Sequence, residues 1–417
     1  GSAASPRVGR TPAFEYAVKM REFPAHARLD RKLEADEVPR SALARFAERL
    51  ARFHGSLPPI RGIVADEIGK AALRNLDELG GQFSHNRALP LLRAWLKRQC
   101  ASLAGVFAQR AATSHRECHG DLHLQNLLMR VGEIMAFDAL EFDRALRDID
   151  VVSEAAFLAM DLRAHGRTDL AYAFLNRYLE AMGDYGGADV LPFYLVHRAL
   201  IRAKVAAIKR AQGAADDHGA QHYLATAVEL TAATRPLLVV THGLSGSGKT
   251  SVTDELVGRL PALRVRSDLE RKRLHGLEPA VRTGSALSAG LYAADATRRT
   301  YGVLADSADR LLRSGQTAVV DATFLRRSER LEFRQIAAAN AARFVILDCA
   351  ASPRELRRRV AARASAGRDA SEADLAVLEH QLVTHEPLDG AERRAAVTVD
   401  TEQPIRYERL AARLQKA

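Results

Sequence analysis

Downstream of Pro236, short apolar runs alternate regularly with longer amphipathic segments. Five of the apolar runs predict strands, at residues 237–241, 263–268, 317–323, 343–348 and 396–400. One of the intervening helical patterns ends at Gly315, which we expect to be its C-cap. Strands that alternate with helices form a parallel sheet covered on both faces, so this half of the chain is predicted to have an α/β fold.

Upstream of Pro236, the pattern is mainly helical. Apolar periodicity predicts helices at residues 39–54, 91–108, 150–162, 169–182 and 191–210, after a strand-like start at residues 14–20. Residues 118–143 differ, because they predict a loop and two short strands at 126–130 and 133–138.

A domain boundary is predicted near residue 232. The most linker-like segment covers residues 211–221, and the pair Arg235-Pro236 marks the start of a new unit. We therefore predict a mainly helical domain at residues 1–232 and an α/β domain at residues 233–417.

Composition agrees with two globular domains. A chain of 417 residues exceeds one ordinary core, and 47% hydrophobic with 27% charged residues is typical of a soluble protein. No apolar run reaches the roughly 18 residues of a transmembrane helix, and the first residues lack a signal-peptide pattern. Three widely spaced cysteines, Cys100, Cys118 and Cys349, favour a reducing cytoplasm over disulfides or a zinc site.

The net charge of +10 is concentrated in the second half of the chain. From Arg235 onward, 30 Lys and Arg stand against 23 Asp and Glu. An anionic small ligand or a nucleic acid explains this excess. The alternative is a general enrichment in arginine, as in an Arg- and Ala-rich proteome.

Residues 243–250 fit the Walker A pattern G-x-x-x-x-G-K-T/S directly after a predicted strand. Glycines allow backbone N–H groups to approach phosphate oxygens, and a helix N-terminus adds its positive end. Lys249 is expected to hold the β- and γ-phosphates and Thr250 to bind Mg²⁺; the alternative is a chance glycine-rich turn. The expected nucleotide contacts are Gly243, Ser245, Gly246, Ser247, Gly248, Lys249, Thr250 and Ser251.

Two carboxylates follow predicted strands of the same sheet. Asp268 is expected to end the second strand and to accept the proton of an acceptor hydroxyl; the alternative is that Ser267 or Asp268 caps a helix. Asp321 ends an apolar strand, as a Walker-B-type carboxylate does, and is expected to hold the Mg²⁺ shell through water. Its alternative is a cap for the following helix.

An arginine-rich helical segment supplies cations for a transferring phosphoryl group. Arg359 and Arg363 lie four residues apart on one helical face and are expected to form a lid over ATP. The alternative is a solvated helix face. Further candidates are Arg354, Arg357, Arg358 and Arg368, with Arg271 and Arg273 for the acceptor.

These motifs together make residues 236–417 resemble the small P-loop kinase group, which includes gluconate kinases, zeta-toxin-like kinases, chloramphenicol phosphotransferases and the kinase domain of polynucleotide kinases. The resemblance implies ATP and Mg²⁺ as cofactors, with GTP as the alternative nucleotide. It also implies that Asp268 activates the acceptor and that the arginine-rich helix forms the lid. Acceptors differ widely within the group, so the resemblance names the reaction rather than the acceptor.

A second motif lies upstream. His119, Asp121 and Asn126 have the spacing H-x-D-x-x-x-x-N of a phosphotransferase catalytic loop, and Asp138 follows at the end of a short strand. Asp121 is expected to orient or deprotonate a hydroxyl, while Asn126 and Asp138 bind Mg²⁺. The alternative is a turn with local side-chain hydrogen bonds.

This segment resembles the aminoglycoside phosphotransferase (protein-kinase-like) family, and more closely a fusion of such a domain to a P-loop kinase. By that resemblance, Asp150 heads a helix that braces the loop, and His119 and His123 are structural. The family's nucleotide-gripping N-terminal lobe has no complete counterpart, since no glycine-rich hairpin precedes Lys19. We interpret the strand containing Lys19 as the hinge between lobes, so that either the native protein is longer or this half is degenerate.

Three functions fit these observations. The first is a kinase of a small hydroxyl-bearing molecule, with the chemistry in the P-loop domain and the upstream domain binding substrate, regulating or forming a second site. The second is a regulatory or toxin-like nucleotide-binding module. The third is a 5′-hydroxyl polynucleotide kinase, which one Trp and 6% aromatic residues disfavour because bases need stacking partners.

Overall fold

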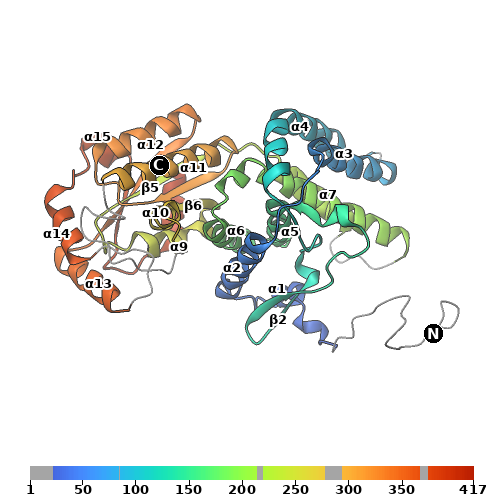
Figure 1. Ribbon diagram of the computed structural model, residues 1–417, viewed down its shortest axis with the longest axis horizontal. Coiled ribbons are helices and arrows are strands. Elements are labelled where there is room, and N and C mark those ends of the chain that lie inside the picture. Colours follow the sequence, from blue (N-terminus) through green and yellow to red (C-terminus); the bar gives the residue numbers. More distant parts are fainter. Residues whose placement is uncertain (1–21, 84, 214–218, 278–293, 367–373) are drawn as a thin grey trace.

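The computed structural model describes residues 22–83, 85–213, 219–277, 294–366 and 374–417. A mainly helical part lies beside an α/β part, as Figure 1 shows. The strand-like segment 14–20, with Lys19, and Arg368 lie outside the described residues.

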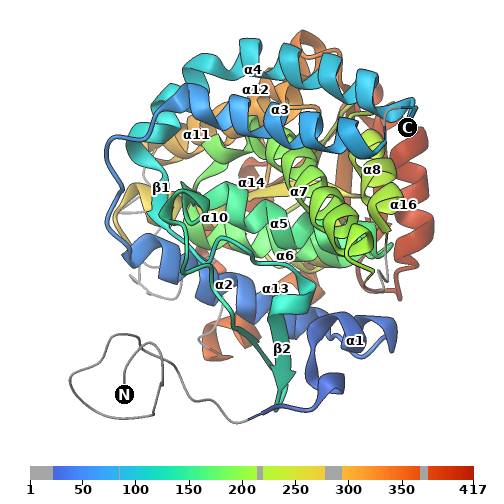
Figure 2. The ribbon, with the colours of Figure 1, turned by 90° about the vertical axis from the view of Figure 1, so that its right-hand side faces the viewer.

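The helical part consists of α- and 3₁₀-helices around a central stack. Figure 2 shows α5, α6 and α7 in the middle, with α3 and α4 above them and α2 below. The α-helices are α1 (Leu29–Glu34), α2 (Arg40–Ser56), α3 (Ala65–Gln82), α4 (Ala88–Thr113), α5 (Val151–Ala164), α6 (Thr168–Met182), α7 (Leu191–Ala211) and α8 (Gly219–Leu230). The 3₁₀-helices are η1 (Ala25–Ala27), η2 (Leu124–Asn126), η3 (Arg144–Leu146) and η4 (Tyr185–Asp189).

The five helices predicted upstream are present as α2, α4, α5, α6 and α7. Helices α1 and α3 were not predicted, and glycines at positions 69, 80 and 81 of α3 explain part of this omission. The predicted linker at residues 211–221 separates α7 from α8. It therefore lies between two helices, as expected, and upstream of the predicted boundary near residue 232.

Two small antiparallel pairs hold the segment between α4 and α5. Strand β1 (His115–Glu117) pairs with β4 (Asp148–Asp150). Strand β2 (Leu127–Arg130) pairs with β3 (Glu133–Ala136), close to the two strands predicted there. The loop with the upstream motif connects the two pairs.

The α/β part contains a five-stranded parallel sheet in the order β6-β7-β5-β8-β9. Its strands are β5 (Leu237–His242), β6 (Ala262–Arg266), β7 (Thr317–Asp321), β8 (Arg343–Ala350) and β9 (Ala396–Asp400). Its helices are α9 (Lys249–Arg259), α10 (Ser267–Leu274), α11 (Ala294–Arg313), α12 (Arg327–Ala339), α13 (Pro353–Ala366), α14 (Leu375–Thr384), α15 (Gly390–Arg394) and α16 (Tyr407–Lys416). The predicted α/β fold is confirmed, and helix α11 ends just before Gly315, whose φ of +78° suits a C-cap.

Helices cover both faces of this sheet because successive strand residues point to opposite sides. Leu237 and Val239 of β5 pack with α9 and α16 in one apolar cluster. Leu238 and Val240 pack with α11 and α12 in a second cluster, which continues into the helical part. The two parts therefore share one core.

The edge strand β6 is covered by α6 of the helical part. Asn176 donates from Nδ2 to the carbonyl of Ala262 at 2.8 Å and accepts from the backbone N–H of Arg264 at 2.6 Å. The fully buried Arg264 guanidinium lies 2.6 Å from Glu180 on α6 and 2.6 Å from Asp254 on α9. Backbone groups of β6 are thus hydrogen-bonded, and the charge of Arg264 is paired, by residues of α6 across the interface.

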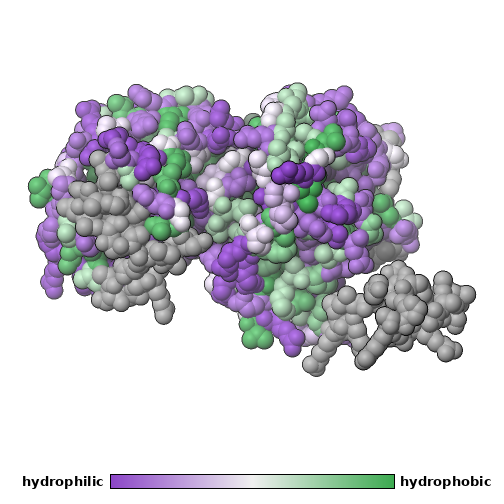
Figure 3. Space-filling model, in the orientation of Figure 1, coloured by the Kyte–Doolittle hydropathy of each residue, from purple (hydrophilic) through white to green (hydrophobic). Residues whose placement is uncertain are grey.

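The face of the molecule seen in the orientation of Figure 1 is predominantly polar. Figure 3 shows hydrophilic residues over most of the visible face, with the apolar patches small and separate. Among the described helices, none combines the length and apolar character needed to cross a membrane.

The Arg264 ion pairs generate a stability prediction. Arg264→Met leaves Glu180, which is 3% exposed, without this guanidinium. We expect the free energy of unfolding to fall by about 3 kcal/mol, because the buried Glu180 carboxylate loses two hydrogen bonds from Arg264 and keeps, among the described residues, only its ion pair with Arg177. Urea unfolding measures the change.

The matched control is Arg74→Met, which removes the exposed Arg74–Glu67 pair of α3. That variant should lose less than about 1 kcal/mol. Equal losses in the two variants contradict the role assigned to Arg264.

Candidate functional site

A glycine-rich loop connects β5 to α9. Gly243, Gly246 and Gly248 have φ of +141°, +84° and +83°, where other residues are strained. A Cβ at Gly243 would lie 2.6 Å from the Cys349 carbonyl oxygen, and one at Gly246 would lie 3.0 Å from that of Leu356. Glycine is therefore required, and the loop leads directly into the N-terminus of α9, as a phosphate cradle does.

Lys249 lies over this loop at the first position of α9. Its Nζ donates to the carbonyl oxygens of Gly243 at 2.8 Å and Leu244 at 2.9 Å. Burial lowers the pKa of Lys249, while the carboxylates of Asp321 and Asp268 oppose that shift. The ammonium group is thus partly desolvated and held at the cradle, where it strengthens contacts with an anion.

A cavity of about 200 Å³ opens beside the loop and gathers most of the predicted P-loop residues. They come from the loop, from the start of α10, from the end of β7 and from α13. Those that line it are Ser245, Gly246, Gly248, Lys249, Thr250, Ser251, Asp268, Asp321, Arg359 and Arg363. Ser267, Ala322 and Thr323 also line it and were not predicted, because no motif marks them.

Asp321 is the buried carboxylate of this cavity. It ends β7, as predicted, and its Oδ2 accepts a hydrogen bond from the Thr253 hydroxyl at 3.1 Å. Burial raises the pKa of Asp321, although Arg264 and Arg266 oppose the shift. The alternative of a helix cap is wrong, since α12 begins only at Arg327.

Asp268 lies where two cavities meet. The prediction that it ends a strand is wrong, because β6 ends at Arg266 and Asp268 is in the first turn of α10. No side chain caps α10, so the capping alternative is wrong as well. The Asp268 carboxylate accepts from the Ser267 hydroxyl at 3.2 Å and lies 3.9 Å from the Arg266 guanidinium.

The arginine-rich segment forms α13, and two of its arginines line the cavity. Arg359 donates to Glu355 at 2.6 Å, to the Thr401 hydroxyl at 2.9 Å and to the Thr401 carbonyl at 2.8 Å. Arg363 lies one turn further along the same face. The others project to solvent: Arg354, Arg357 and Arg358 are exposed, with Arg357 paired to Glu379 and Arg358 to Glu355.

A larger cavity of about 1010 Å³ adjoins the first and shares Ser245, Ser267, Asp268 and Thr323 with it. Its wall is rich in hydroxyl, amide and charged side chains, including Arg271, Arg298, Tyr301, Glu329, Glu332, His380 and Gln381. Arg273 does not line it. Its guanidinium pairs with Glu270 and donates to the Glu180 carbonyl at 2.7 Å, so it serves the interface with the helical part instead.

The upstream motif brings Asp121 and Asn126 together. Asn126 Nδ2 donates to the Asp121 carboxylate at 2.8 Å, and His123 Nε2 lies 3.2 Å from the same carboxylate. Although burial opposes it, the hydrogen bond from His123 and the charge of Arg202 lower the pKa of Asp121 to about 2. This carboxylate is therefore kept ionised.

Asp138 lies close along the backbone but points away from the core. The N–H of Phe137 donates to the Asn126 carbonyl at 3.1 Å, which places the two segments side by side. Asp138 is exposed and has a φ of +61°.

Hydrogen bonds from neighbouring segments hold the loop that carries the upstream motif. His119 Nε2 lies 2.8 Å from the Phe137 carbonyl, and Glu154 accepts from the backbone N–H groups of His119 and Gly120. Asp150 caps α5, accepting from the Val152 N–H at 2.9 Å, and pairs with Arg110 at 2.6 Å.

Comparison with known proteins places similarity in both parts. Residues 238–388 match the family described as AAA domain. The chain is 31% identical over 368 residues to an uncharacterized protein of Mycobacterium tuberculosis (strain ATCC 25618 / H37Rv), covering 86% of this chain and 74% of that protein.

Two solved structures similar to this chain each overlap less than half of it. One is a putative kinase from Chloroflexus aurantiacus J-10-fl, 20% identical with a TM-score of 0.36, covering 44% of this chain and 98% of that one. Another is a gluconokinase from Sinorhizobium meliloti 1021, 24% identical with a TM-score of 0.31, covering 44% and 93%.

The Asp121 environment predicts a pH-dependent stability. Its folded pKa of about 2 lies below the ordinary 3.8, so the ionised form stabilises the fold above pH 4 and that contribution disappears as pH falls toward 2. Asp121→Asn should cost about 2 kcal/mol at pH 7, and the difference from wild type should shrink as pH approaches 2. Urea unfolding at several pH values measures it.

Asp138→Asn is the control, since Asp138 is an exposed carboxylate of the same segment. Its effect should stay within about 0.5 kcal/mol. A pH-independent cost for Asp121→Asn contradicts the interpretation.

Proposed function

This chain belongs to the same family as the uncharacterized mycobacterial protein, and on that premise we propose that it is an ATP- and Mg²⁺-dependent kinase of a small hydroxyl-bearing molecule. One observation carries the proposal. Lys249, Asp268, Asp321 and the Arg359–Arg363 pair, which are distant in sequence, line a single cavity at a glycine cradle. Each matches one requirement of phosphoryl transfer.

The nucleotide phosphates are held by the loop. Its backbone N–H groups and Lys249 contact the β- and γ-phosphates. Glycine at position 246 keeps the loop in this conformation, because a Cβ there would meet the Leu356 carbonyl of α13. Thr250 and Asp321 are an oxygen donor pair of the kind that Mg²⁺ prefers. The metal ion, when bound, neutralises charge on the phosphates; the protein's part is to hold Asp321 through Thr253.

Asp268 activates the acceptor. Because it lies in both cavities, it reaches a hydroxyl in the larger one and the γ-phosphate position in the smaller one. The acceptor oxygen forms a bond to the γ-phosphorus, the bond to the β-phosphate oxygen breaks, and the hydroxyl proton passes to the Asp268 carboxylate. The polar wall of the larger cavity suits an acceptor with several hydrogen-bonding groups.

Arg359 and Arg363 stabilise the charge that develops during transfer. Arg359 is already oriented by Glu355 and Thr401, so its guanidinium loses little freedom when it meets a phosphate. The two arginines also screen the cavity from the side of α13.

The helical part contributes a second polar site, formed by Asp121 and Asn126 with Asp138 nearby. We assign Asp121 to orienting a hydroxyl, and Asn126 and Asp138 to binding Mg²⁺. Acceptor binding, regulation and a second transfer site are the three roles open to this half, and the following experiment separates the transfer site from the other two.

Phosphoryl transfer should be lost in Lys249→Ala, whereas Asp121→Ala should keep much of it. Incubating the protein with ATP-Mg²⁺ and a metabolite extract should give a product heavier by one phosphoryl group, found by mass spectrometry. Lys249→Ala and Asp268→Asn should each lower its rate by about 100-fold or more, since each removes a group acting on the transferring phosphate.

Arg357→Gln is the control, because Arg357 is on α13 but pairs with Glu379 at the surface. It should keep wild-type activity. If Asp121→Ala abolishes transfer while Lys249→Ala retains it, the chemistry belongs to the helical part. Labelling of 5′-hydroxyl oligonucleotides in place of any metabolite identifies a polynucleotide kinase, and tight ATP binding without transfer identifies a regulatory module.

Nucleotide affinity should depend on glycine at position 246. Gly246→Ala places a Cβ 3.0 Å from the Leu356 carbonyl at a φ of +84°, so the loop must shift. We expect ATP affinity to fall at least about tenfold by calorimetry, from roughly 1–3 kcal/mol of strain. Gly105→Ala, where nothing lies within 4 Å, should bind ATP like wild type.

A further inference from the structure

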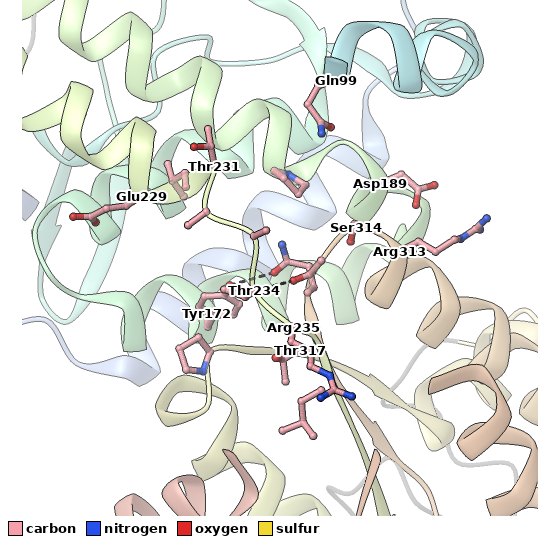
Figure 4. Close-up of a pocket in the computed structure, with 18 of the residues that line it drawn as sticks. Gln99, Tyr172, Asp189, Glu229, Thr231, Thr234, Arg235, Arg313, Ser314 and Thr317 are labelled. Atoms are coloured by element: carbon pink, nitrogen blue, oxygen red, sulfur yellow. Dashed lines mark hydrogen bonds between the residues drawn. The ribbon is translucent and has the colours of Figure 1, made fainter. Parts of the chain in front are cut away.

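A cleft of about 990 Å³ lies between the two parts of the molecule, away from the phosphate loop. Its walls are α4, the connecting segment 231–236 and the amino ends of β5, β7 and β8. Figure 4 shows Gln99 of α4 above, Thr231 and Thr234 of the connecting segment in the middle, and Thr317 at the start of β7 below.

The connecting segment is tied to the rim of this cleft. Thr234 donates to the Gly315 carbonyl at 3.4 Å, and the Tyr172 hydroxyl donates to Gln316 at 3.2 Å. Side chains from both parts thus meet at one opening, which a small molecule can bridge.

Positive charge dominates the cleft. Five arginines and two carboxylates line it. Arg310 pairs with Asp189 at 2.7 Å, and Arg313 pairs with Asp309 at 3.1 Å. These two arginines are therefore neutralised by neighbours.

The other three arginines, Arg163, Arg235 and Arg343, have no carboxylate partner in the described part of the chain. Arg235 donates to the Ala341 carbonyl at 3.2 Å, and Arg343 donates to the Gln415 carbonyl. Backbone carbonyls hold these two guanidinium groups in place without cancelling their charge. Glu229, the second lining carboxylate, is exposed and forms no ion pair with a described residue.

Part of the cleft lining is apolar. It includes Trp95, Leu103 and Val106 of α4 and also Pro192. Trp95 is the single tryptophan of the chain. A cleft lined both by guanidinium groups without a carboxylate partner in the described part of the chain and by an indole suits a ligand that has a phosphate and a ring.

We propose that this cleft binds a small phosphorylated metabolite with a planar apolar part, contacted by Arg163, Arg235 and Arg343 and by the α4 wall. The site is separate from the phosphate loop. Strand β5 runs from Leu237 at the cleft to His242 before the loop, which is about 17 Å at roughly 3.3 Å per residue. A ligand there contacts both parts and the connecting segment, so it stabilises their arrangement.

Trp95 fluorescence tests the proposal, because the chain has no other tryptophan. Adenosine monophosphate is the probe, and adenosine is its uncharged counterpart. The probe should shift the emission of the full-length protein saturably below about 10 mM, while adenosine should not. Lys249→Ala, which weakens anion binding at the loop, should leave the titration unchanged. Arg343→Gln and Arg163→Gln should each weaken binding about tenfold.

Arg334→Gln, an exposed arginine of α12 outside the cleft, is the matched control and should bind like wild type. Thermal unfolding without ligand verifies that every variant is folded, and the probe should raise the midpoint in wild type and Lys249→Ala alike. No shift with the probe, equal binding of adenosine, or a signal lost in Lys249→Ala but kept in Arg343→Gln overturns the proposal. Inorganic phosphate should bind more weakly than the probe; equal affinity overturns the role of the apolar wall.

Discussion

The buried guanidinium of Arg264 connects the two parts of this protein to the phosphate site. It pairs with Glu180 from the helical part and Asp254 from α9, and it donates to the Thr253 hydroxyl at 2.9 Å. Thr253 in turn donates to Asp321. Although burial opposes it, these carboxylates raise the pKa of Arg264, so the charge persists inside the protein. The position of Asp321 therefore depends on a residue of the other half.

The parallel sheet explains why the two cavities and the cleft lie where they do. Because all five strands run in one direction, their carboxyl ends collect the phosphate loop, Asp268 and Asp321 at one edge. Their amino ends meet the connecting segment and α4 at the opposite edge. The same strands therefore join the proposed nucleotide site to a cleft that the helical part completes.

Sequence patterns predicted the sheet well, because strands buried on both faces are short apolar runs with distinct ends. The last strand has the predicted bounds, Ala396–Asp400. Asp268 was misplaced, since Ser267 and Asp268 continue an extended-looking run although a helix begins there. Helix α3 was missed because its glycines weaken the helical pattern, whereas packing against α4 and α7 stabilises it in the fold.

The sequence by itself determined the phosphate loop and the Asp121–Asn126 motif. The residues of each motif are only a few positions apart, so the local backbone conformation fixes their relative positions. Only the tertiary structure decided which arginines are buried in ion pairs and which line the cleft. Arg264 appears in the sequence as one more charge in a basic strand, yet it is fully buried and paired with Glu180 of the helical part and Asp254 of α9. Arg163, Arg235 and Arg343 are separated by up to 180 residues, and only folding brings them to one cleft. The burial of an arginine and the carboxylates that neutralise it depend on residues distant in sequence. The spacing of residues along the chain does not indicate these contacts.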